Sequence, residues 1–237
     1  MQVTEVTDIV NLDCVVPFFQ PIMDLENNAV WSYECLARLL DLEETSYLPS
    51  EFLFLVERQQ SVAQLTQTVF SRSASYFRDI NMAWNINLSL ADMIDTETLH
   101  FLESQLQSYP NPQRISIEIT AKNALAESSK FDQFCQVCNG LGVNIVIDTF
   151  DQQGCALQAL FALPIAAIKV SAALFDDAKT EQETKTFLEN LIDSANHNNI
   201  AVIAERIESK DTLEIVKQLD VKYAQGFYFR HPMPNTD

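Results

Sequence analysis

The stretch that decides the fold is residues 115–148, ISIEITAKNALAESSKFDQFCQVCNGLGVNIVID. It begins with a short β-rich run at Ile115–Ile119, continues through a helical stretch at Glu127–Leu141, and ends with a second β-rich run at Val143–Asp148. Such alternation is typical of βα units and predicts a mostly parallel sheet. Both β-rich runs carry an acidic residue at or near their C-terminal end.

The same alternation continues through most of the chain. The other expected strands are Val15–Pro21, Ala29–Cys35, Ala83–Asn87, Ala166–Val170, Ala201–Ala204 and a short one near Tyr223. The other expected helices are Pro49–Gln59, Val62–Arg78, Thr96–Ser108, Thr180–Ala195 and Lys210–Gln218. This pattern fits either a closed barrel or an open doubly wound sheet. No glycine-rich phosphate loop follows the first strand, which argues against a dinucleotide-binding sheet but leaves both α/β arrangements open, the (β/α)₈ TIM-like barrel and the open sheet.

Charge and hydropathy limit the classes of function. The chain has 33 acidic and 15 basic residues, and its net charge of −18 repels nucleic-acid polymers at long range. A small phosphate ligand is still compatible with this field, because metal ions or local cations can reverse it inside a pocket. No run approaches the about 18 consecutive apolar residues of a membrane span, and residues 1–13 lack the basic start of a secretory signal. We therefore expect a bacterial cytoplasmic protein that binds no membrane.

The five cysteines, Cys14, Cys35, Cys135, Cys138 and Cys155, do not indicate a disulfide framework. Their number is odd, and no secretory signal accompanies them. Cys135 and Cys138 form a C-x-x-C pair within a helical stretch, without a second pair or histidines nearby. Packing in the core is favoured there over a metal or redox site.

Residues able to bind metal or phosphate recur at or near the ends of the expected strands. They are Glu34, Asn87, Glu118, Asp148, Lys169, Glu205 and Gln225. A single acid at a strand end is more often a solvated loop residue or a helix cap. In a (β/α)₈ barrel, however, all such ends meet on one face, where active sites lie. Carboxylates and an amide that converge there predict an oxygen-rich site suited to Mg²⁺ or Mn²⁺ rather than zinc.

A series of short motifs contains these residues. They are FQPI at 19–22, ECLAR at 34–38, NINLS at 85–89, EIT at 118–120, DTFD at 148–151, IKVS at 168–171, AERIE at 204–208 and QGFYF at 225–229. In this order and at this spacing, they resemble the signatures of the EAL family of cyclic di-GMP phosphodiesterases. The resemblance implies a stand-alone single domain over residues 1–237, with an EAL-type barrel as its core at about 15–234.

The resemblance also implies a reaction, the metal-aided hydrolysis of cyclic di-GMP to linear pGpG, and a role for each matching residue. Ligands of Mg²⁺ or Mn²⁺ are implied at Glu34, Asn87, Glu118 and Asp148. Catalytic roles, at a second metal ion or at the attacking water, are implied at Lys169, Glu205 and Gln225. Contacts to cyclic di-GMP are implied at Gln20, Leu36 and Arg38, and the guanidinium of Arg38 suits a phosphate oxygen.

The chain departs from the family's pattern at several positions that matter for this reaction. Carboxylates or a glycine of the family are replaced at Ala121, Thr149, Ser171 and Arg206. The hydroxyl of Thr149 removes a full negative charge from the expected second metal site, and the loop at 151–156 has lost its pattern. We predict a degenerate member of the family with weakened or lost hydrolysis. Compensation by Asp151, Arg206 or solvent is the alternative.

Three functions of different classes follow from these motifs. The first is a slow cyclic di-GMP phosphodiesterase, and the second is a module that binds cyclic di-GMP without cleaving it. The third is a catalytically inactive regulator that acts through a protein partner without nucleotide. A protein partner or a homodimer is a further possibility. The family often dimerises near the loop that is altered here, so the alteration weakens the case for the homodimer.

Overall fold

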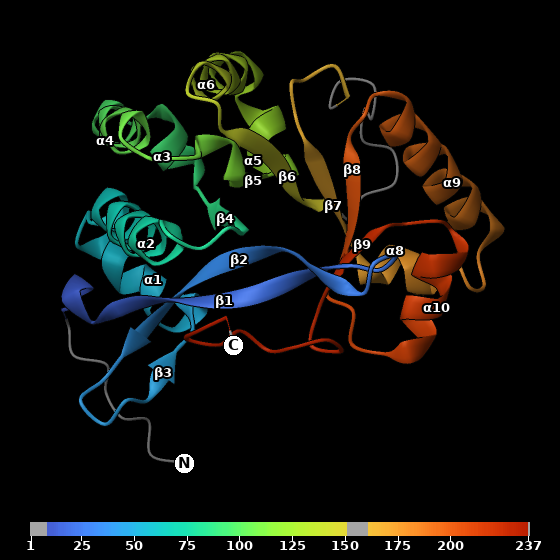
Figure 1. Ribbon diagram of the computed structural model, residues 1–237, viewed down its shortest axis with the longest axis horizontal. Helices are drawn as coiled ribbons and strands as arrows, with labels where there is room; N and C mark the ends of the chain where they lie inside the picture. The colour runs from blue at the N-terminus through green and yellow to red at the C-terminus, as the bar shows by residue number, and fades with distance from the viewer. Residues whose placement is uncertain (1–8, 151–160, 237) are drawn as a thin grey trace.

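The computed structural model describes residues 9–150 and 161–236. Within these ranges eight strands close into a barrel, because β1 pairs with β9 on one side and with β2 on the other (Figure 1). In barrel order they are β1 (Val15–Asp24), β9 (Tyr223–Gln225), β8 (Ala201–Glu205), β7 (Ala167–Ser171), β6 (Asn144–Phe150), β5 (Ile115–Thr120), β4 (Ala83–Asn87) and β2 (Ala29–Leu40). The predicted TIM-like barrel is confirmed, and the open sheet is excluded.

The first strand differs from the others in direction. β1 runs antiparallel to both β2 and β9, whereas the remaining neighbours in the barrel are parallel. Residues 25–28 join β1 to β2, and so short a turn allows only an antiparallel pair. In this turn Asp24 accepts hydrogen bonds from the backbone N–H groups of Glu26 and Asn27, and Asn28 takes a left-handed φ of 49°. The hairpin extends β1 and β2 beyond their predicted ends, and β3 (Ser46–Tyr47) pairs with the end of β2.

Helices surround the barrel (Figure 1). The long ones are α1 (Pro49–Arg58), α2 (Val62–Phe77), α4 (Thr96–Gln107), α6 (Ser128–Gly140), α9 (Gln182–His197) and α10 (Lys210–Gln218), each within two residues of its prediction. The short ones, which were not predicted, are α3 (Leu90–Ile94), α5 (Ala121–Ala126), α8 (Ala172–Asp177) and the 3₁₀ turns η1 (Leu12–Cys14) and η2 (Pro112–Arg114). A hydroxyl caps each short α-helix at its N-terminus, at Ser89, Thr120 and Ser171. None of the described helices is both long enough and apolar enough to span a bilayer.

The apolar core has two parts. The larger part fills the space between barrel and helices and includes Trp84, Cys135 and Cys138, all at most 2% exposed. Both cysteines are free thiols and are buried, which confirms the prediction that they pack in the core. The smaller part lies inside the barrel and is made by Ile22, Val146, Ala167 and Ile203, with Trp31 stacked on Tyr223 beside it. One end of the barrel interior is therefore apolar, and the polar residues gather at the other.

Candidate functional site

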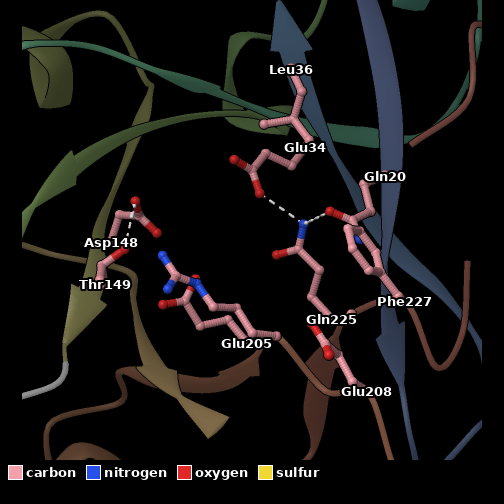
Figure 2. Close-up of a pocket in the computed structure, with 11 residues that line it drawn as sticks. Gln20, Glu34, Leu36, Asp148, Thr149, Glu205, Glu208, Gln225 and Phe227 are labelled. Atoms are coloured by element: carbon pink, nitrogen blue, oxygen red, sulfur yellow. Dashed lines mark hydrogen bonds between the residues drawn. The ribbon is translucent and has the colours of Figure 1, made fainter. Parts of the chain in front are cut away.

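Polar side chains from neighbouring strands meet inside the barrel, towards the C-terminal ends of its parallel strands (Figure 2). Glu34 of β2 pairs in register with Gln20 of β1 and with Asn85 of β4. Asn87 of β4 pairs in register with Glu118 of β5. Successive residues of a strand face opposite sides, so these side chains are brought to one layer by register alone.

Lys169 of β7 lies at the centre of this layer and is only 1% exposed. Its Nζ lies 2.7 Å from Oε2 of Glu34, 2.7 Å from Oε2 of Glu118 and 3.9 Å from Oδ1 of Asp148. Burial alone would lower the pKa of Lys169, but the negative charges of Glu118 and Glu34 outweigh burial and raise it. The buried ammonium therefore holds together three carboxylates that would otherwise repel one another.

Glu34 is the most heavily hydrogen-bonded acid of the site. Its Oε1 accepts from Nδ2 of Asn87 at 2.6 Å, and its Oε2 accepts from Nζ of Lys169 and from Nε2 of Gln225, both at 2.7 Å. Burial opposes ionisation of Glu34, but the charge and hydrogen bond of Lys169 lower its pKa below the ordinary value. The same amide of Gln225 also donates to Oε1 of Gln20 at 3.2 Å (Figure 2).

Glu118 is fully buried and is held from a second side. Nδ2 of Asn85 donates to its Oε1 at 2.7 Å, and Oδ1 of Asn85 in turn accepts from the hydroxyl of Ser32 at 2.8 Å. Burial, reinforced by the charge of Glu34, raises the pKa of Glu118 to about 8. Sequence reasoning missed Asn85 and Ser32. The two-residue alternation could have found them, because each precedes a predicted site residue by two positions and so faces the same side of its strand.

A cavity of about 310 Å³ opens above this layer. Of the residues predicted to contact a ligand, Gln20 and Leu36 line it. Arg38 lies elsewhere: it is 8% exposed, its Nη1 donates to the carbonyl oxygen of Ala37 at 2.7 Å, and its guanidinium lies 5.7 Å from the ring of Phe18. A phosphate contact by Arg38 stays a prediction.

Two further acids, Asp148 of β6 and Glu205 of β8, border the cavity (Figure 2). Glu205 is 7% exposed, and no donor among the described residues reaches its Oε1. Burial and the adjacent charge of Asp148 raise the pKa of Glu205 to about 7. The hydroxyl of Thr149 donates to Oδ2 of Asp148 at 3.2 Å. This pair thus carries negative charge that Lys169 does not fully offset.

Gly226 lines the cavity and packs closely against the backbone of Ile207. The backbone N–H of Ile207 donates to the carbonyl of Gln225 at 2.9 Å, and the carbonyl of Ile207 accepts from the N–H of Tyr228 at 2.9 Å. This places the backbone of Ile207 so close to Gly226 that an added Cβ would lie 2.1 Å from the oxygen of Ile207. Gly226 also has a φ of 157°. Only glycine fits here, and it ties the segment after β8 to the segment after β9.

The sequence pattern of the EAL domain family matches residues 5–232. The chain belongs to the EAL domain family. Among curated proteins, it is 25% identical to the oxygen sensor protein DosP of Escherichia coli K12, over 91% of this chain and 28% of that protein. It is also 25% identical to the probable cyclic di-GMP phosphodiesterase PdeG of the same organism, over 94% of this chain and 45% of that protein. The chain thus spans about a quarter to a half of the length of these relatives.

Solved structures show the same fold as this EAL domain. The FimX EAL domain of Pseudomonas aeruginosa, solved bound to cyclic di-GMP, has a TM-score of 0.84 and 24% identity, covering 95% of this chain and 93% of that one. An EAL domain protein of Listeria monocytogenes has a TM-score of 0.86 and 22% identity, covering 99% and 94%. At these low sequence identities, the structural similarity establishes the fold and nothing more.

The four positions predicted to depart from the family's pattern have different surroundings. Ala121 is buried at the start of α5. Ser171 caps α8 and pairs in register with Glu205. Thr149 and Arg206 both line the cavity, and both have left-handed φ angles, of 49° and 60°. The altered loop at 151–156, with Asp151 and Cys155, lies outside the described residues.

The donor set of this EAL domain bears on its predicted metal site. Among the residues that the structure describes, no group of three or more His, Cys, Asp or Glu side chains is arranged to hold a metal ion by itself. Lys169 lies where the carboxylates of Glu34, Glu118 and Asp148 converge. The unpartnered Oε1 of Glu205, close to Asp148, is nevertheless the kind of oxygen that a divalent cation would satisfy. The ligand assignments stay predictions.

Proposed function

We propose that this EAL domain binds cyclic di-GMP in the cavity above Lys169 and hydrolyses it to pGpG at most slowly. The observation that carries the proposal is the combination of an assembled inner layer with an altered rim. Lys169 joins Glu34 and Glu118 within 2.7 Å, whereas Thr149, a neutral residue, stands beside Asp148 at the rim. The names of PdeG, a probable phosphodiesterase, and of the FimX EAL domain, solved with cyclic di-GMP, support the ligand.

Mg²⁺ or Mn²⁺ fits part of this site. Asp148 and Glu205, with Glu34, Asn87 and Glu118 beneath them, would hold it, because oxygen ligands of this kind suit hard divalent cations. A bound ion would supply activation of water and charge neutralisation at the phosphate. Thr149 provides no carboxylate for a second ion. We infer that hydrolysis is weakened for this reason.

The chain's own residues contribute positioning. Nε2 of Gln225 is held by Glu34 and Gln20, while its buried Oε1 has no partner among the described residues. That oxygen can accept a hydrogen bond from a water molecule, which matches the role predicted for Gln225. Lys169 keeps Glu34 ionised and in place, so that the carboxylate remains available to the ligand site.

The test is a titration of the purified protein with cyclic di-GMP by calorimetry, in Mg²⁺, in Ca²⁺ and in chelator, with products separated by chromatography. We expect saturable binding and slow formation of pGpG in Mg²⁺ that disappears in Glu34→Gln. Binding without any pGpG would leave a sensor of the nucleotide. Rapid formation of pGpG in Mg²⁺ would refute the inference that hydrolysis is weakened. The absence of binding in all three buffers would refute the proposal and favour the regulator that acts through a protein partner.

A further inference from the structure

Two strands of the barrel have the same unusual backbone feature, one near its C-terminal end and the other just after it. At the end of β8, Glu205 borders the cavity, and strand alternation would turn the next side chain, Arg206, towards the surrounding helices. Arg206 instead has a φ of 60° and lines the cavity with an exposed side chain. β6 repeats this arrangement, since Asp148 is followed by Thr149 with a φ of 49°, which also lines the cavity. A left-handed conformation is uncommon for residues other than glycine and is found preferentially at functional sites.

The charges around the cavity are strongly unbalanced. The described residues that line it include four acids, Glu34, Asp148, Glu205 and Glu208, but Arg206 is the only basic residue among them. Lys169 lies beneath the cavity, is 1% exposed, and is already bound to Glu34 and to the buried layer. Among the described residues that line the cavity, only Arg206 can therefore meet an anionic ligand with a positive charge; otherwise the ligand needs an added cation or Arg38, which does not line the cavity.

We propose that Arg206 binds a phosphate oxygen of the cyclic dinucleotide and thereby makes binding largely independent of divalent cations. This inference rests on the proposed function. A guanidinium remains charged at all relevant pH values, and its fork of N–H groups matches two phosphate oxygens. Within the described ranges its guanidinium makes no ion pair within 4.0 Å, although its charge already acts on the neighbouring Glu205 and partly offsets the rise that burial causes in the pKa of that carboxyl.

The backbone next to Arg206 is held firmly enough to present the side chain. Ile207, the following residue, donates to the carbonyl of Gln225 and accepts from Tyr228, both at 2.9 Å, and it packs against Gly226. The neighbouring Glu205 is 7% exposed and fixed on β8. Arg206 thus extends from an anchored turn rather than from a free loop.

The test compares the wild type with Arg206→Gly, Arg206→Lys and a control, Lys210→Gln, by calorimetric titration with cyclic di-GMP in chelator and in Ca²⁺. Glycine adopts a left-handed φ freely, so Arg206→Gly removes the guanidinium without straining the turn. Lys210 is an exposed residue outside the cavity, 3.5 Å from Glu214, and its substitution matches the loss of one positive charge. Thermal melting of each variant checks that the fold is kept.

We expect the wild-type Kd in chelator to lie within about threefold of that in Ca²⁺. Arg206→Gly should raise the Kd in chelator at least about tenfold, as loss of a charge-assisted hydrogen bond does. Arg206→Lys should restore part of the affinity, and Lys210→Gln should change it less than about twofold. Wild-type binding that requires Ca²⁺, with an unchanged Kd in Arg206→Gly, would overturn this inference while the proposed function stands. Equal increases of the Kd in Arg206→Gly and Lys210→Gln would also overturn it, since the loss of one positive charge anywhere on the surface would then explain the effect. No binding by the wild type in either buffer would refute both proposals.

Discussion

Glu205→Gln tests how much the ionised carboxylate of Glu205, at the cavity, lowers the free energy of unfolding. Burial and the charge of Asp148 raise the pKa of Glu205 from an ordinary 4.5 to about 7. The folded state therefore binds this proton more tightly than the unfolded state does. The contribution of Glu205 to the free energy of unfolding is therefore fully present below pH 4.5 and is lost as the pH rises through about 7. At about 1.4 kcal/mol per pKa unit, the full loss is about 3 kcal/mol.

Glutamine has nearly the same shape as glutamate and carries no charge to bury. We therefore expect Glu205→Gln to be more stable than the wild type at pH 8 by about 2–3 kcal/mol, and to differ little at pH 4.5. For a chain of this length, that gain corresponds to a rise in Tm of about 4–12 °C. Urea unfolding followed by circular dichroism at both pH values measures the difference, and comparison with the wild type cancels the titration of other acids.

The matched control is Glu208→Gln, which removes an exposed acid from the same cavity wall. Its substitution should change the free energy of unfolding by less than about 0.5 kcal/mol at either pH. If Glu205→Gln were no more stable than the wild type at pH 8, the carboxyl would not be poorly solvated in the folded protein. The electrostatic account of the Asp148–Glu205 pair would then be wrong.

Three further substitutions test other parts of the site. Thr149→Asp introduces a carboxylate at a left-handed position, which aspartate tolerates better than a β-branched residue does. We therefore expect Mn²⁺-dependent formation of pGpG, followed by chromatography, to rise at least about tenfold, and an unchanged rate would contradict the proposed effect of Thr149. Gly226→Ala puts a Cβ 2.1 Å from the oxygen of Ile207, and urea unfolding should show a loss of about 2–4 kcal/mol, which wild-type stability would contradict. Asn85→Ala leaves Oε1 of the buried Glu118 without its amide donor, and we expect a loss of about 1–3 kcal/mol in the same assay; a neutral effect would mean that the amide does not hold Glu118 in place.

The course of the chain could largely be predicted from the sequence, since long helices and β-rich runs have clear patterns. The direction of β1 was not predicted, although residues 25–28 leave room only for a hairpin. The short helices α3, α5 and α8 were missed for a different reason. Each has five or six residues, too few to show a helical period, and it is the capping hydroxyl at Ser89, Thr120 or Ser171 that marks where they begin.

The convergence of polar residues at the strand ends was predicted better than their contacts. Strand ends in a barrel converge on one face, so residues such as Glu34, Glu118 and Lys169 could be grouped without knowing any distance. Their hydrogen bonds could not be predicted, because Lys169 lies 135 positions from Glu34 in the chain and the bond depends on barrel register. The left-handed conformations of Thr149 and Arg206 could not be predicted either, because the backbone preferences of threonine and arginine disfavour a positive φ.

Lys169 explains how such a barrel can change at its rim and still fold. A buried group of acids needs positive charge, and Lys169 supplies it for Glu34 and Glu118 at 2.7 Å without any metal ion. Asp148 lies farther from the ammonium, at 3.9 Å, and Glu205 has an oxygen without a partner among the described residues. A cation bound at the rim would therefore act mainly on these two acids and on the ligand. It follows that a neutral residue such as Thr149 at the rim should affect turnover and the affinity for phosphate while leaving the inner layer, and with it the fold, intact.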